Sequence, residues 1–114
     1  MSVKLTTRQV GDVTVIDAVG RITHGEGSSA FRETIRDLSG KGNQKLLLNL
    51  AEVSYIDSSG IGELVSAFTT VTNHGGVLKL LNLNKRVKDL LQITKLYTVF
   101  EVHDDEATAV RSFS

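Results

Sequence analysis

One segment in the middle of the chain constrains the fold most, because an extended apolar run gives way there to a helical apolar pattern. The run is Leu46-Leu47-Leu48-Asn49-Leu50, and the segment Asp57-Ser58-Ser59-Gly60-Ile61-Gly62 comes shortly after it. Downstream, apolar residues recur with the spacing of one helix face: Ile61, Leu64, Val65, Phe68 and Val71. The sequence therefore predicts a strand-and-loop segment that turns into a helix at an acid, two hydroxyls and two glycines.

The start of this predicted helix has a distinctive chemistry. The first turn of a helix has backbone N–H groups without intrahelical partners and carries a partial positive charge. A serine placed there caps the helix and stays accessible to solvent. It is also a place where a covalently attached phosphate is readily held. We therefore expect Ser58 or Ser59 to cap the helix and to be a possible phosphorylation switch.

The flanking sequence predicts strands that alternate with helices. Strands are expected at residues 3–9, 13–19, 45–50, 77–83 and 97–102. Helices are expected around Phe31, Ile35 and Leu38, through the motif to His74-Gly75-Gly76, after a cap at Asn84, and from a cap at Asp104 through Val110. This order, β-β-α-β-α-β-α-β-α, predicts an α/β fold with a mixed, mostly parallel sheet covered by about four helices. The length of the chain suggests a single domain over residues 1–114.

The composition argues against several classes of function. Thirteen basic residues balance thirteen acidic ones, whereas nucleic-acid binders and polybasic membrane anchors carry a basic excess. There is no cysteine, so disulfides and thiolate metal sites are excluded. No apolar run approaches the length of a membrane span. We therefore expect a cytoplasmic protein that contacts neither nucleic acid nor membrane.

Other candidate sites are weaker. Gly25-Glu26-Gly27 and Gly40-Lys41-Gly42 lack the spacing of a complete phosphate-binding loop, so they favour a loop and a helix stop. His24, His74 and His103 share no ligand spacing, and the chain has no nucleophile elbow. We expect no catalysis, no metal and no cofactor.

The motif Asp57-Ser58-Ser59-Gly60-Ile61-Gly62 resembles the signature of the STAS-domain family, in particular the bacterial anti-sigma-factor antagonists. In that family the regulatory phosphate is attached to the hydroxyl directly after the aspartate. The resemblance therefore implies that Ser58 is phosphorylated, with Ser59 as the alternative. Gly60 and Gly62 would leave bare backbone for an approaching kinase or phosphatase, although Gly62 could instead serve close helix packing.

The resemblance also implies a cycle of partner switching. The unphosphorylated protein would bind an anti-sigma factor with Ser-kinase activity and so free the sigma factor. Phosphorylation of Ser58 would end the complex, and a PP2C-type phosphatase would restore it. The family's loop after the second strand lies near the phosphorylated end, which implies that Thr23 and His24 help to bind the partner. Where many members have Gly-x-Leu-Asp, this chain has Gly20-Arg21-Ile22-Thr23.

Two alternatives remain open. The chain could be a structural STAS subunit of a stress-sensing scaffold or of a lipid-transport complex at the inner membrane. Separately, Lys85, Arg86 and Lys88 near the start of the short helix form either a solvated face or a docking surface for an acidic partner.

Overall fold

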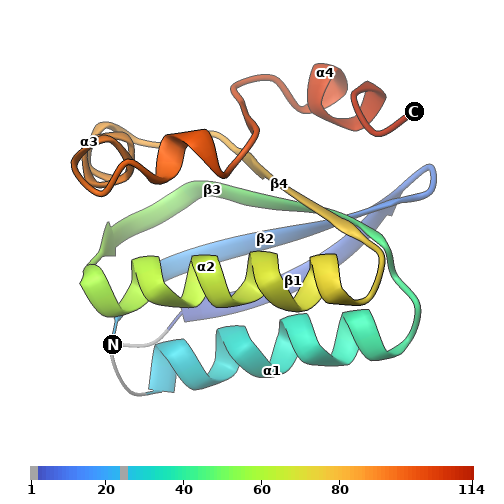
Figure 1. The fold of residues 1–114 in the computed structure, drawn as a ribbon, viewed down its shortest axis with the longest axis horizontal. Coiled ribbons are helices and arrows are strands. Elements are labelled where there is room, and N and C mark those ends of the chain that lie inside the picture. The colour runs from blue at the N-terminus through green and yellow to red at the C-terminus, as the bar shows by residue number, and fades with distance from the viewer. Residues whose placement is uncertain (1–2, 24–25) are drawn as a thin grey trace.

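The computed structural model describes the backbone of residues 3–23 and 26–114, with side chains described for residues 3–23 and 29–114 (Figure 1). The elements follow the predicted order of strands and helices. In chain order they are β1 Val3–Val10, β2 Val13–Ile22, α1 Glu26–Gly40, β3 Lys45–Ile56, α2 Ser58–Asn73, β4 Val77–Leu81, α3 Lys85–Ile93, the 3-10 helix η1 Leu96–Thr98, β5 Val102–His103 and α4 Glu106–Arg111. The predicted α/β class is confirmed.

The strands form one mixed sheet in the order β1-β2-β3-β4-β5. β1 and β2 pair antiparallel, and the remaining neighbours pair parallel. Parallel neighbours need a crossover, which α1, α2 and α3 supply. Figure 1 shows α1 and α2 side by side across one face of the sheet and α4 on the other. Because β2, β3 and β4 point the same way, the helices that follow them begin at one end of the sheet.

The central strand β3 explains why the core has two parts. Leu46, Leu48 and Leu50 are buried in the larger apolar cluster, which contains residues of α1 and α2. Leu47 points to the opposite face and packs in a smaller cluster with Ala109 of α4. A strand covered on both faces reads as a continuous apolar run. The prediction that this run is central and covered on both faces is confirmed.

Two strand boundaries differ from the predicted ones. β3 continues to Ile56, so the residues directly before the motif are strand and not loop, because Arg21 and Ile22 of β2 pair with Tyr55 and Ile56. β4 ends at Leu81 and not at residue 83. Asn82 takes a left-handed conformation with φ of 60° there, which an asparagine tolerates better than most residues.

The predicted last strand at residues 97–102 is wrong over most of its length. Its first part is η1, and β5 contains two residues. Phe100 is buried and meets the Phe68 ring edge-to-face at 5.5 Å, so this segment packs against α2 before any strand pairing begins. The predicted cap of the last helix is displaced by one residue. Asp105, and not Asp104, accepts the Thr108 N–H at 2.9 Å.

Polar side chains tie the sheet to α4. Arg8 of β1 pairs with Asp17 of β2 at 2.7 Å and with Glu106 of α4 at 2.5 Å. Asn49 of β3 donates to Asp17 at 2.8 Å, and Asn82 donates to Asn49 at 3.2 Å. The network crosses from β1 to the end of β4. Separately, no helix within the described ranges is long and apolar enough to cross a membrane.

The Arg8 network predicts how stability depends on pH. Hydrogen bonds from Arg8 lower the pKa of Asp17 and of Glu106 below their ordinary values of 3.8 and 4.5. Carboxyls whose pKa is lower in the folded protein stabilise it above the unfolded pKa, and this stabilisation is lost as the pH falls through the folded pKa. Arg8→Met should therefore lower the free energy of unfolding by about 1 kcal/mol at pH 7. The difference from the wild type should shrink below pH 4.5.

Urea unfolding at a series of pH values measures this difference. Arg36→Met is the matched control, because Arg36 is also exposed and no ion pair is recorded for it among the described residues. A loss of stability in Arg8→Met that stays constant from pH 7 to pH 2 would mean that Arg8 acts only by packing its alkyl chain.

Candidate functional site

The motif forms the junction between β3 and α2. Ile56, the last residue of β3, is buried, and Asp57 follows it with extended backbone at φ −107° and ψ −173°. The Asp57 carboxylate accepts the Gly60 N–H at 2.8 Å, so Asp57 is the N-cap of α2. The prediction that Ser58 or Ser59 caps this helix is wrong, because aspartate caps as well as serine and stands one position earlier.

The two serines occupy the first turn of α2, and both are exposed. Residues four apart on a helix lie on the same side, so Ser58 shares a side with Gly62, and Ser59 shares one with Glu63. Gly62 is exposed, and apart from its chain neighbours and the backbone of its own helix no atom lies within 4 Å of the place where its Cβ would be. Glu63, in contrast, pairs with Arg32 of α1 at 2.5 Å. Ser58 therefore borders open surface, whereas Ser59 lies on the side that turns toward α1.

Gly60 has a role different from that of Gly62. It is buried, and a Cβ at this position would lie 2.2 Å from the Ile22 carbonyl oxygen and 2.5 Å from Ile56 Cγ1. Its missing side chain makes room for the end of β2 and not for an approaching protein. This contact brings Thr23, which follows β2 and is half-buried, next to the motif. His24 lies outside the described residues.

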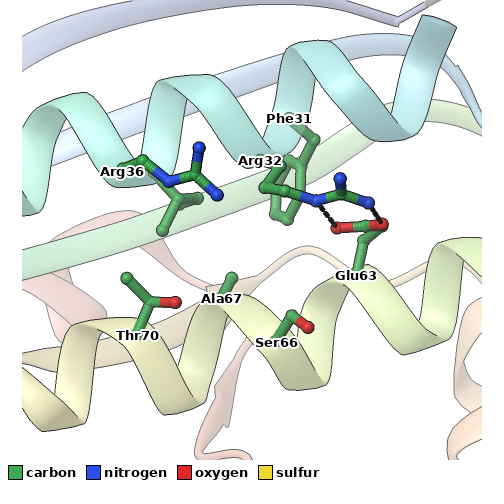
Figure 2. A pocket seen from close by; sticks show the side chains of 8 residues that line it. Phe31, Arg32, Arg36, Glu63, Ser66, Ala67 and Thr70 are labelled. Carbon is green, nitrogen blue, oxygen red and sulfur yellow. Dashed lines mark hydrogen bonds and ion pairs between the residues drawn. The ribbon is translucent and has the colours of Figure 1, made fainter.

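The groove between α1 and α2 is narrow. Figure 2 shows the Arg32 guanidinium meeting the Glu63 carboxylate across it, with Arg36 further along α1. Hydrogen bonding to Glu63 raises the pKa of Arg32 above its ordinary value. The cavity has a volume of about 20 Å³. This space holds about one water molecule, which is far too little for a nucleotide or another organic ligand.

The structure does not bring the described histidines to the motif. His74 lies just beyond the opposite end of α2, with Nδ1 2.8 Å from the Thr70 carbonyl oxygen. His103 of β5 has its Nε2 atom 2.6 Å from Glu101 Oε2. Hydrogen bonds from Lys79, and to a smaller extent from His103, lower the pKa of Glu101. Across residues 3–23 and 29–114, whose side chains are described, no group of His, Asp or Glu side chains is arranged to hold a metal ion.

Sequence reasoning missed a cluster close to the motif. The Tyr55 ring has the Arg21 guanidinium carbon 4.8 Å from its centroid and that of Arg86 at 4.3 Å. Arg86 belongs to the basic segment noted in the sequence, but nothing there indicated Arg21 or Tyr55. Their association depends on the register of β2 against β3, which local sequence patterns do not give.

The two glycines predict opposite responses to the same substitution. Gly60→Ala should lower the free energy of unfolding by about 1–3 kcal/mol, because the new methyl group collides with β2. Gly62→Ala should leave stability unchanged or raise it by up to about 1 kcal/mol, because it adds a better helix former in open space. Urea unfolding of both variants measures the difference. Equal losses in the two variants would contradict the described packing.

Comparison with known proteins places the chain in a family. The STAS domain profile matches residues 4–109. An anti-sigma-B factor antagonist of Bacillus subtilis is 39% identical over 72 residues, which are 63% of this chain and 65% of that protein. The crystal structure of a candidate anti-sigma factor antagonist from Thermotoga maritima has a TM-score of 0.87 at 25% identity, over 95% of this chain and 92% of that one.

A further solved structure is that of SpoIIAA, a cell fate determinant of Bacillus, in its phosphorylated form. Its TM-score is 0.76 at 20% identity, over 97% of this chain and 100% of that one, which shows a shared fold. The profile match covers most of the described elements, from β1 into α4. The chain therefore belongs to the STAS domain family.

Proposed function

We propose that this protein is an anti-sigma factor antagonist that binds its partner through the start of α2 and is switched off by phosphorylation of Ser58. The partner is an anti-sigma factor with Ser-kinase activity, and its capture frees a sigma factor. The observation that carries the proposal is the exposed Ser58 at the first position of α2, directly after the capping Asp57. The names of the relatives, which include an anti-sigma-B factor antagonist, support the activity.

The surroundings of the two serines favour Ser58 as the acceptor. A kinase must bring its active site against the hydroxyl, and the open position at Gly62 leaves space one helical turn from Ser58. A phosphate on Ser59 would instead lie on the same side as the Glu63 carboxylate, which would repel it. The ion pair between Arg32 and Glu63 would also have to rearrange to accommodate that phosphate.

The phosphate can act without unfolding the start of α2. A phosphoserine adds a charge of about −1.5 to −2 at neutral pH, and the N-terminus of a helix favours negative charge. Toward a partner, however, the phosphate repels any facing carboxylate. Two unit charges 4 Å apart interact by about 4 kcal/mol at an effective dielectric constant of about 20. That energy changes an affinity about a thousandfold.

The proposed contact surface consists of Asp57, Ser58, Ser59, Gly62 and Thr23, with His24 next to it in sequence. Gly60 is buried beneath this surface and supports it indirectly, because its missing side chain lets the end of β2 approach the start of α2. The protein itself contributes a substrate hydroxyl and a binding face, while ATP belongs to the partner. A PP2C-type phosphatase returns the protein to its binding form. We place the cycle in the cytoplasm, where a released sigma factor meets RNA polymerase.

Phosphorylation is the first test. Incubation with the anti-sigma factor kinase and ATP should place phosphate on Ser58, as located by mass spectrometry. Ser58→Ala should stay unmodified and bind the anti-sigma factor constitutively. Ser58→Asp should weaken binding at least about tenfold, which corresponds to about 1.4 kcal/mol.

Two controls accompany this test. Ser59→Ala should be modified like the wild type, and the protein with ATP alone should gain no phosphate. Phosphate on Ser59 alone would overturn the site assignment. Modification without the kinase would show instead that the chain is itself an enzyme.

The open position at Gly62 gives a second test. Gly62→Val should weaken binding of the anti-sigma factor at least about tenfold, because its side chain fills the space beside Ser58. Its free energy of unfolding should change by less than about 1 kcal/mol, since valine is no worse than glycine in a helix. Calorimetric titration and thermal melting measure the two effects.

Thr72→Leu is the matched control, because it adds bulk at an exposed position in the last turn of the same helix. It should bind like the wild type. If Gly62→Val loses stability while its folded fraction keeps full affinity, Gly62 serves packing alone.

A further inference from the structure

The Tyr55 cluster lies at the same end of the sheet as Ser58. Its residues come from three elements: Arg21 from β2, Tyr55 from β3 and Arg86 from α3. Tyr55 stands three positions before Ser58, and the chain between them is the end of β3 and the cap of α2. Both arginines are exposed, while Tyr55 is half-buried. The cluster is therefore an accessible pair of positive charges on an aromatic platform close to the motif.

The cluster is held by its framework. Arg21 and Tyr55 are direct neighbours in the parallel pairing of β2 with β3. The Asn84 side chain fixes α3 in place, because its Nδ2 donates to the Val53 carbonyl oxygen at 2.7 Å and its Oδ1 accepts the Val87 N–H at 2.9 Å. Arg86 thus belongs to a helix that is hydrogen-bonded to β3, the strand that also carries Tyr55. The backbone that carries the three side chains is therefore already in place before a ligand binds, which lowers the entropic cost of binding.

The two guanidinium groups keep their hydrogen-bonding capacity. Stacking on a ring uses the face of a guanidinium and leaves the N–H groups at its edge free to bind a carboxylate. Among the described side chains, ion pairs are recorded for Arg8 and Arg32, and none for Arg21 or Arg86. Lys85 already pairs with Asp89 at 3.0 Å. Other basic side chains such as Arg36 also lack an ion pair among the described residues, but Arg21 and Arg86 are the two that meet at one aromatic ring.

We propose that Arg21, Tyr55 and Arg86 form a docking site for an acidic segment of the protein partner. The inference rests on the proposed function for the identity of that partner. A carboxylate fits the edge of a guanidinium through two parallel hydrogen bonds. An extended nucleic acid fits less well, because the chain has no basic excess and Asp57 follows the cluster closely.

This site gives the phosphate on Ser58 a second action. The phosphate repels an acidic partner directly, and it also offers the nearby guanidinium groups an anion within the same chain. The acidic segment of the partner is then repelled by the phosphate and at the same time competes with it for the two guanidinium groups. Two moderate effects combine in one modification.

The test uses hexaglutamate peptide as the probe in a titration followed by two-dimensional ¹H–¹⁵N NMR. The side-chain Nε–H signals of Arg21 and Arg86 should shift, whereas that of Arg36 should not. The double variant Arg21→Gln/Arg86→Gln should bind the peptide at least about tenfold more weakly, and Arg36→Gln should bind it like the wild type. Raising the salt from about 20 to about 150 mM should weaken peptide binding by the wild type much more than by the double variant.

The same double variant should bind the anti-sigma factor at least about tenfold more weakly, with its fold checked by the dispersion of the backbone NMR signals. Unchanged affinity for the peptide or for the anti-sigma factor would overturn the docking site. A hexathymidylate strand that binds the cluster more tightly than hexaglutamate would make it a nucleic-acid site instead. If Ser58→Asp keeps full affinity for the anti-sigma factor while the double variant loses it, the phosphorylation switch fails and the docking site stands.

Discussion

The close approach of Gly60 to the Ile22 carbonyl oxygen fixes the geometry of the whole motif. A side chain at residue 60 would overlap this oxygen, so the end of β2 and the start of α2 meet only because the residue is glycine. With the helix held there, Asp57 caps it from the preceding position, and Ser58 is left exposed in the first turn. Thr23 is brought to the same place from a distant part of the chain. A buried backbone contact thus determines what the surface presents.

Local sequence patterns were sufficient for the architecture. The apolar run before the motif predicts a strand covered on both faces, and Leu46 and Leu47 indeed pack in different clusters. The helix spacing after it predicts α2 with its buried side. These elements are predictable because neighbouring residues alone determine their periodicity. The motif itself predicts a polar first turn at the end of a strand, whichever residue serves as the cap.

The failed predictions concern relations between distant segments. Phe100 packs on Phe68, and the segment predicted as a strand from residue 97 begins instead as the end of the 3-10 helix η1. The roles of Gly60 and Gly62 look alike in sequence and differ only because β2 lies against one of them. Arg21 and Tyr55 meet through strand register. In each case the deciding contact joins residues that are far apart along the chain.

A balanced net charge conceals an uneven distribution of charge. Arg8, Arg32 and Lys79 are each matched by carboxylates, on the α4 side, between α1 and α2, and beside β5. Such pairs contribute little stability individually, but each places a carboxylate beside its cation. Arg21 and Arg86 differ from the other cations without an ion pair among the described side chains, because both lie over the same aromatic ring.

The edges of the sheet limit how this domain associates with other chains. An exposed strand edge is a template for adding another strand, which leads to aggregation or to recognition of extended peptides. β5 offers only two residues at one edge. At the other edge, the outer strand β1 displays Lys4 and Arg8, and charged side chains discourage further pairing. Because one edge is short and the other is charged, the sheet resists being extended strand by strand into a fibre.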